Sequence, residues 1–157
     1  MKPNFELVTE LQTLTRRDFP LANPALLAPY DANAILDGEW LDLAAYKLQR
    51  GNAETNPLVF PVHTERGRYD VQAIQKASVL FFGMYEAETA IYEGNLVVGD
   101  KLTVQDIAAG VFTGKRGLKK ATAATAGAVV VGIVSKAAAN GRVRFVHFGN
   151  QIVDIPA

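Results

Sequence analysis

Two glutamates of "YEAET" are the residues whose type and spacing come closest to chemistry. Glu86 and Glu88 stand two residues apart, so on a strand both carboxylates would share one face with Cβ atoms about 7 Å apart. A pair of carboxylates can hydrolyse a glycosidic bond, but such enzymes hold the two groups across a cleft, usually from different segments. We therefore interpret Glu86 and Glu88 as the outward-facing polar edge of a strand.

The two histidines and the lack of cysteine limit which metal sites and catalytic residues the chain could contain. The chain has two histidines, His63 and His147, and no cysteine. The spacing of the two histidines is not that of a zinc site, and the lack of cysteine excludes disulfides, thiolate metal sites and cysteine nucleophiles. No Gly-x-Ser-x-Gly motif is present. The sequence predicts no catalytic residue, no metal site and no cofactor, so we expect a protein that is not an enzyme.

The stretch "GVFTGKRG", from Gly110, is similar to a phosphate-binding loop but departs from its pattern. That motif needs four residues between its first Gly and the Gly-Lys pair, and then Ser or Thr. Here three residues intervene, and Arg116 stands at the hydroxyl position. We interpret "GKRGLKK" as a solvated basic loop. Its cations Lys115, Arg116, Lys119 and Lys120 have no interleaved aromatic residues to stack bases, which predicts no direct nucleic-acid contact and leaves an acidic protein surface as a partner.

Composition and charge are those of one globular domain. The 157 residues are 49% apolar and 20% charged, with 16 basic and 16 acidic groups. Residues 1–60 carry 5 basic and 8 acidic groups, residues 61–100 carry 3 and 6, and residues 101–157 carry 8 and 2. Either folding mixes these segments and cancels the division, or the polarised chain associates with copies of itself or with a charged partner.

No segment is expected to enter a membrane. The longest uncharged run that contains the valines, 121–135, has 15 residues, whereas a membrane span needs roughly 20 apolar ones. The first residues, "MKPNFELVTE", place Glu6 and Glu10 where a signal peptide would need its apolar core. We therefore expect neither a membrane hairpin nor a signal peptide.

From residue 34 the turn signals predict β structure. Asp37-Gly38 is typical of a hairpin turn, which would leave Asp37, Glu39 and Asp42 on its surface. "PLVFPV" predicts an edge strand, because prolines flank it. Further strands are expected in "SVLFFGM", "YEAETAIY" and "NLVVGDKLTV", and one short helix is expected in "RYDVQAIQKA" with Asp70 as its N-cap. The pattern predicts a mainly β fold, a small barrel or sandwich.

The hairpin 128–148 is expected to supply core rather than a ligand site. "AVVVGIVSK" is apolar on both faces, and Asn140-Gly141 is a turn signal followed by an alternating strand, "RVRFVHF". We expect Val129, Val131 and Ile133 to be buried on one face, with Val143 and Phe145 contributed by the partner strand.

Residues 1–33 are predicted to form an N-terminal arm ahead of a β-rich body, residues 34–157. Phe5, Val8, Leu11 and Leu14 have helical spacing, but the prolines of 20–29 break regular structure. The arm either lies across its own domain or covers a neighbour. On the second reading it should be dispensable for folding: a chain lacking residues 1–30 would fold and lose binding to its particle. The residues expected at such an interface are Phe5, Val8, Leu11, Leu14, Phe19, Leu26, Leu27 and Trp40.

Several stretches carry a family likeness. They are "NPALLAPYDANAILDGEWLDL", "FPVHTERGRYDVQAIQKASVLFFGMYEAET", "VGDKLTV" and the closing "GAVVVGIVSKAAANGRVRFV", which together cover about half of the chain. With these the chain resembles the capsid decoration, or cement, proteins of tailed bacteriophages. The pieces "GEWL" and "YEAET" carry most of the resemblance, and "VGDKLTV" the least.

The resemblance implies a non-enzymatic virion protein with a β-rich body and an extended N-terminal arm. It implies binding to the major capsid protein on the outer capsid surface, as a homo-oligomer (dimer or trimer), which stabilises the lattice. An alternative is a virion surface module that adheres to host carbohydrate. For that function Trp40 and Tyr46 are the only candidate pair of exposed aromatic residues.

Overall fold

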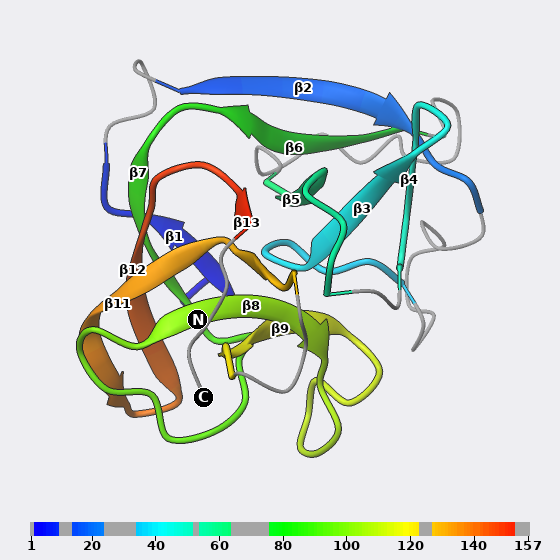
Figure 1. Ribbon diagram of the computed structural model, residues 1–157. Coiled ribbons are helices and arrows are strands. Elements are labelled where there is room, and N and C mark those ends of the chain that lie inside the picture. The colour runs from blue at the N-terminus through cyan, green and yellow to red at the C-terminus, as the bar shows by residue number, and fades with distance from the viewer. Residues whose placement is uncertain are drawn as a thin grey trace.

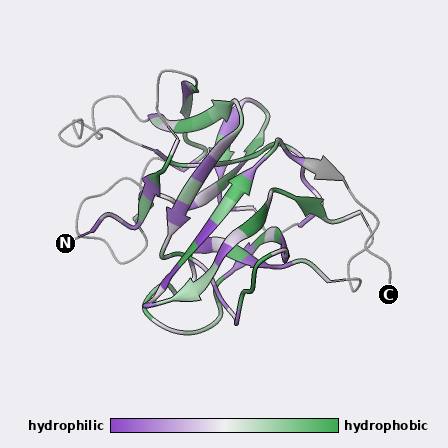
Figure 2. Cartoon of the chain, turned by 90° about the vertical axis from the view of Figure 1, so that its left-hand side faces the viewer, coloured by the Kyte–Doolittle hydropathy of each residue, from purple (hydrophilic) through white to green (hydrophobic). Residues whose placement is uncertain are grey.

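The computed structural model describes residues 2–9, 14–23, 34–51, 54–63, 76–122 and 127–152. These residues form thirteen strands and no helix, so the expected mainly β fold is confirmed. Figure 2 shows the alternation of hydrophilic and hydrophobic residues along several strands, as expected where one face of a sheet packs on a core. The short helix expected around Asp70 falls in 64–75, outside the described residues.

Six strands form one curled antiparallel sheet, at the left and lower side of Figure 1. Their order across the sheet is β1 (Phe5–Leu7), β7 (Tyr85–Thr89), β12 (Arg142–His147), β11 (Gly132–Ala139), β8 (Lys101–Asp106) and β9 (Arg116–Lys120). A short pair, β10 (Val129–Val130) with β13 (Gln151–Ile152), accompanies it. We call the six strands the large sheet.

The other five strands lie in the upper half of Figure 1. They are β2 (Thr15–Pro20), β6 (Lys76–Phe82), β5 (Val59–Pro61), β3 (Trp40–Ala44) and β4 (Lys47–Gln49). β2 pairs with β6, and β3 pairs with both β4 and β5. Two single bridges connect these two sheets, an antiparallel one between Val62 and Val79 and a parallel one between Leu21 and Leu48. The five strands therefore form a closed circuit, which we call the ring.

Three ring strands contribute side chains to two cores, because they lie between them. In β3, Trp40 packs in the core of the large sheet while the next residue, Leu41, packs in the core of the ring. β5 and β6 divide their side chains in the same way. The ring core consists of Phe19, Leu21, Leu41, Leu48, Phe60, Val62, Ala77 and Val79. This double burial explains why the polar residues of β3 are not at a surface.

The hairpin of β11 and β12 is confirmed, with one change of face. Val129, Val131, Val143 and Phe145 are buried as expected. Ile133 is only half-buried, and Val134 is the buried residue instead. The chain leaves strand geometry at Val131, between β10 and β11, so the alternation restarts one residue later in β11. The expected edge strand is also confirmed, since β5 is the end strand of its sheet.

The turn at Asp37-Gly38 exists, but it does not join two strands of a hairpin. Gly38 has φ +85°, and a Cβ placed on it would lie 2.5 Å from the Cβ of Phe5. Glycine is therefore required both by the backbone and by the close approach of β1. The hairpin of this region is instead β3 with β4, whose turn is formed by Ala45 and Tyr46.

The described part of residues 1–33 is integrated in the body, which corrects the expected arm. Phe5 pairs with Thr89 in the large sheet, and Phe19 pairs with Ala77 in the ring. Both phenylalanines are buried in a core, and the helical spacing that begins at Phe5 corresponds to strand β1. Removing residues 1–30 would delete β1 and β2, so the expectation that the body folds without them rests on a wrong premise.

Candidate functional site

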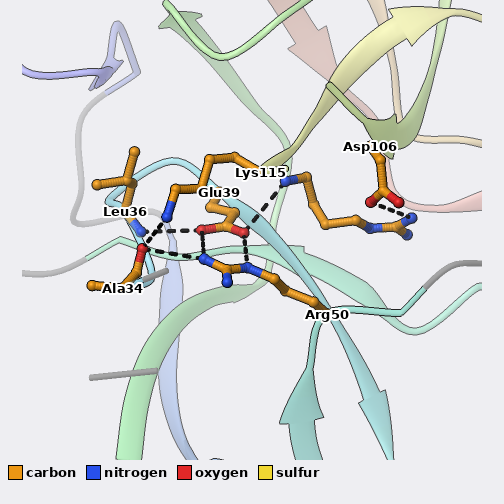
Figure 3. A network of polar contacts seen from close by, with 7 residues as sticks. Ala34, Leu36, Glu39, Arg50, Asp106 and Lys115 are labelled. Carbon is orange, nitrogen blue, oxygen red and sulfur yellow. Dashed lines mark hydrogen bonds and ion pairs between the residues drawn. The ribbon is translucent and has the colours of Figure 1, made fainter. Parts of the chain in front are cut away.

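A buried polar network lies where the ring meets the large sheet, and Glu39 is its centre (Figure 3). The Glu39 side chain is fully buried and accepts hydrogen bonds from Arg50 through Nε (2.5 Å) and Nη2 (3.1 Å). It also accepts bonds from the backbone N–H of Leu36 (3.1 Å) and of Arg116 (3.3 Å). Four donors compensate the buried carboxylate, so its geometry is that of a structural anchor.

Asp42 and Arg116 form the second part of this network. The Arg116 guanidinium lies 3.3 Å from Oδ1 of Asp42 and 3.7 Å from Oδ1 of the more exposed Asp106. Burial raises the pKa of Asp42 above its ordinary value of 3.8, and the charge and hydrogen bond of Arg116 oppose that rise. Gly51 contacts the same carboxylate so closely that a Cβ there would lie 1.3 Å from Oδ2. We call Glu39, Asp42, Arg50, Lys115 and Arg116 the joint.

Two sequence expectations are wrong at the joint. Glu39 and Asp42 are not surface residues of a hairpin, because β3 is buried on both faces. "GKRGLKK" is not a solvated loop either: Arg116 begins strand β9, and Lys115 is buried and donates from Nζ to the carbonyl of Ala34 (2.5 Å). Basic residues can be buried when acceptors on a neighbouring element pair with them, and the spacing of the basic residues alone does not indicate this.

The division of charge along the sequence is largely cancelled by pairing. Cations from residues 101–157 meet carboxylates from residues 1–100 in several ion pairs. These are Arg116 with Asp42, Lys119 with Glu93, Lys120 with Asp100, and Arg142 and Arg144 with Glu88. The mixing interpretation is therefore favoured, and the charge division no longer motivates self-association.

The side chains of Glu88 and His147 are engaged in contacts within the fold. Arg142 Nε donates to Glu88 Oε1 at 2.6 Å, and this bond, together with one from Arg144, lowers the pKa of Glu88 below its ordinary value of 4.5. Glu86 accepts a hydrogen bond from the hydroxyl of Ser135. The His147 ring is buried, stacks on Tyr85 and lies with Nδ1 2.6 Å from the carbonyl of Val131. Burial lowers its pKa, so it is a neutral core residue.

The expected interface residues have different positions. Phe5, Phe19 and Trp40 are fully buried and cannot contact a partner, and Leu14 packs against the core of the large sheet. Val8 is exposed. Leu11, Leu26 and Leu27 lie outside the described residues, so their role stays a prediction.

Two of the most exposed apolar side chains lie close together in sequence, at the passage from β6 to β7. Phe82 is 75% exposed and Met84 68% exposed, and Gly83 between them has φ +117°. Val8, 45% exposed, directly follows β1, and its N–H is bonded to the carbonyl of Glu86 in β7. We call Phe82 and Met84 the apolar corner. The alternation of "SVLFFGM" predicted the strand, whereas the turn out of it carried no recognised signal.

No family model matches the chain, and no curated protein matches it either. Within the described ranges, no group of three or more His, Cys, Asp or Glu residues could hold a metal ion. The same part of the chain contains no helix that could span a membrane. The two surfaces on which a function can be argued are the apolar corner and, on the ring, an aromatic cluster around Arg17.

Proposed function

We propose that this protein is a structural component of a tailed-phage virion that binds the major capsid protein lattice from outside and stabilises it, without catalysis. It would act as a homo-oligomer, a dimer or a trimer, on the outer capsid surface. Besides the family likeness of its sequence, one observation of the surface carries this proposal. That observation is the apolar corner, which leaves two large side chains mostly in water.

An exposed cluster of this kind is unfavourable unless another surface covers it. Phe82 and Met84 are unbranched or aromatic side chains of the type that anchors protein interfaces. Phe82 is the last residue of β6 and is opposite Thr15, whereas Met84 directly precedes β7, whose first residue Tyr85 is opposite His147. The neighbouring strands are held by pairing, so docking orders mainly the two side chains and part of the gain from burial is kept as affinity. The corner replaces the buried phenylalanines as the expected attachment surface.

The test is co-sedimentation of the purified full chain with capsids of its virus from which the protein has been removed. Wild-type protein should sediment with the capsids and saturate, and electron microscopy should show added density at symmetry-related positions. The variant Phe82→Asp should lose most binding, because an exposed charge would have to be buried in an apolar contact. Its melting temperature should stay near that of the wild type, since the side chain is mostly in water.

Val111→Asp is the matched control. Val111 is 92% exposed and lies between β8 and β9, at the opposite end of the large sheet from β1 and β7. This variant carries the same new charge and should bind like the wild type. Failure of the wild-type protein to bind capsids would overturn the proposed function. Equal loss in both variants would show that the corner is not the contact.

A second candidate, adhesion to carbohydrate, is favoured by one observation on the ring. Of the aromatic pair expected for that function, Trp40 is buried but Tyr46 is 59% exposed. Tyr46 also stands beside the guanidinium of Arg17. A glycan array with the labelled full chain tests this function independently of capsid binding.

A further inference from the structure

Three aromatic side chains surround the guanidinium of Arg17 on the surface of the five-stranded ring. Its Cζ atom lies 5.0 Å from the ring centre of Phe19, 5.5 Å from that of Tyr46 and 5.3 Å from that of Phe81. The rings come from β2, the β3–β4 turn and β6, and Arg17 Nη2 also donates to the hydroxyl of Tyr46. Cation–π contacts from three directions hold the guanidinium in one place while leaving it exposed.

The charge of this guanidinium is not compensated by the described part of the chain. No carboxylate of the described residues forms an ion pair with Arg17 there, although every cation of the joint has a partner. The neighbouring Asp18 is engaged by the hydroxyl of Ser78. An arginine presents planar N–H donors that match a carboxylate, so a fixed and uncompensated one is a ready receptor for that group.

The turn that supplies Tyr46 is conformationally costly, which is the second observation. Ala45 and Tyr46 have φ values of 49° and 63°, in the left-handed region that side chains other than Gly, Asn and Asp disfavour. The same chain uses Asn140-Gly141, with φ values of 53° and 71°, for the other two-residue hairpin. A strained turn that exposes a tyrosine beside an arginine is typical of a binding site rather than of a simple connection.

We propose that Arg17 and Tyr46 bind a sugar that carries a carboxylate, such as a uronic acid. The carboxylate pairs with the guanidinium of Arg17, and the C–H face of the pyranose ring packs on the exposed ring of Tyr46. An acidic protein side chain would use the arginine but has no need of the tyrosine face, so the pair of residues favours the acidic sugar. The inference rests on the second proposed function, carbohydrate binding, and not on capsid attachment.

The experiment is an NMR titration of the isotopically labelled full chain with sodium glucuronate, with glucose and with acetate. Glucuronate should shift the Arg17 Nε–H and the backbone amides of 45–47, glucose should shift neither, and acetate should act only on Arg17 and more weakly. Arg17→Ala should reduce the affinity for glucuronate by about tenfold or more, because it removes a charge-assisted hydrogen-bonded pair. The affinity of Arg17→Lys for glucuronate should lie between those of the wild type and Arg17→Ala, because lysine keeps the charge and loses the planar donors.

Two further variants complete the test. Tyr46→Ala should weaken glucuronate binding more than acetate binding, because it removes the stacking face for the sugar as well as one of the contacts that hold the Arg17 guanidinium. Lys101→Ala removes an exposed cation from β8 in the large sheet and should bind glucuronate like the wild type. The melting temperature of each variant is measured. If Arg17→Ala is unstable, Arg17→Lys still tests the site.

Each remaining outcome overturns the inference in a recognisable way. If glucuronate shifts no resonance of the cluster, or if Arg17→Ala binds it as well as the wild type, the site is wrong. If glucose binds as strongly as glucuronate, carbohydrate binding stands and the acidic specificity fails. If acetate matches glucuronate, or a glutamate-rich peptide binds more tightly, the ligand is an anion or an acidic protein segment and not a sugar. Binding to none of these sugars, together with a blank glycan array, rejects the second function itself.

Discussion

The ring and the large sheet are built from similar residues but are held together differently. In the large sheet, β8 pairs with β9, and β11 with β12, each with the next strand along the chain. The ring contains one such hairpin, β3 with β4, and β2 pairs with the distant β6, much as β1 pairs with β7 in the large sheet. What differs is that the two sheets of the ring are joined only by single bridges, at Leu21 with Leu48 and at Val62 with Val79. Local pairing forms with little loss of chain entropy, whereas closing long loops costs more. The ring therefore depends on its contact with the large sheet for its order.

The joint and the shared strands are what connect the two regions. β3 gives Trp40 to the core of the large sheet and Leu41 to that of the ring, while Glu39 at its start receives hydrogen bonds from both sides. Because the same strand serves both cores, the two regions should unfold together. Trp40 is the only tryptophan, and it is fully buried, so its fluorescence reports on this boundary.

Replacing Phe145 by alanine is expected to have the largest effect, because it empties the centre of the large-sheet core. Its ring lies 6.3 Å from that of Phe5, 6.2 Å from Trp40 and 6.2 Å from Tyr85, and its side chain is fully buried. The free energy of unfolding should fall by about 3–5 kcal/mol. Urea denaturation followed by Trp40 fluorescence and by circular dichroism measures it.

Trp40 fluorescence and circular dichroism also test whether the ring and the large sheet unfold together. Coincident transitions are expected in Phe145→Ala and also in Phe19→Ala, which empties the ring core. If Phe19→Ala instead gives two separated transitions, the ring is an independent unit and the comparison above fails. A loss below about 1 kcal/mol for Phe145→Ala would contradict its burial.

The large sheet was the easier region to predict from sequence, because its signals are local. Asn140-Gly141 specified a turn, and the alternation of "YEAET" and "RVRF" specified the faces of β7 and β12, all as observed. The ring carried fewer such signals: its strands β5 and β6 were expected, but its hairpin turns at Ala45-Tyr46, a pair without turn preference. β1 pairs in the large sheet and β2 in the ring with strands far along the chain, which no local pattern indicates, so the N-terminal strands were taken for an arm.

Glu39→Gln is expected to have the next largest effect, because it weakens the joint while leaving both cores packed. The amide keeps the shape but cannot accept from all the donors that converge on the carboxylate, and Arg50 loses its counter-charge. The free energy of unfolding should fall by about 2–3 kcal/mol, below the range for a fully buried pair because Arg50 is partly exposed. Amide hydrogen exchange should show a greater loss of protection in ring strands β3 and β4 than in β11 and β12.

Asp106→Asn provides the control for that experiment. Asp106 is the exposed member of the network and lies 3.7 Å from Arg116, a distance at which the pair contributes little in water. Its variant should change neither stability nor exchange appreciably. Equal effects at Glu39 and Asp106 would mean that net charge, and not the buried hydrogen bonds, holds the joint.

The joint also shows where sequence reasoning about sites reached its limit. Charged residues next to a turn are usually exposed, and Asp42 and Arg116 were interpreted in that way. Their burial follows from the packing of β3 against β9, where the Arg116 side chain bonds to Asp42 across 74 residues of sequence. Nothing in either segment alone indicates the partner. The cluster at Arg17 was missed for the same reason, since its rings come from three separate elements.

The two hairpin turns offer a smaller and reciprocal test. Ala45→Asn should raise the free energy of unfolding by about 0.5–1 kcal/mol, because asparagine tolerates a left-handed backbone better than alanine. Asn140→Ala should lower it by a similar amount, since Asn140 has nearly the same φ. Thermal and urea denaturation of both single variants measure the pair. If Ala45→Asn is neutral while Asn140→Ala destabilises, the ring turn is not strained, and the argument for a site at Tyr46 loses one of its two supports.

The smallest effect at neutral pH is expected at Glu88, but its pH dependence distinguishes the sheet surface from the joint. The pKa of Glu88 is lowered by hydrogen bonds from Arg142 and Arg144, so the unfolded chain binds the proton more readily. The stability that this carboxylate contributes is therefore present above 4.5 and is lost as the pH falls from 4.5 through its folded pKa. Burial raises the pKa of Asp42, so the folded protein binds this proton more readily than the unfolded chain does. The stability that Asp42 contributes is therefore present at low pH and decreases as the pH rises above 3.8.

Glu88→Gln should then flatten the loss of stability on acidification, whereas Asp42→Asn should steepen it. Because a surface ion pair contributes about 0–1 kcal/mol, the two urea-stability profiles should differ in slope more than in their neutral-pH values. Parallel profiles for both variants would contradict the opposite shifts and, with them, the distinction between an exposed sheet face and a buried joint.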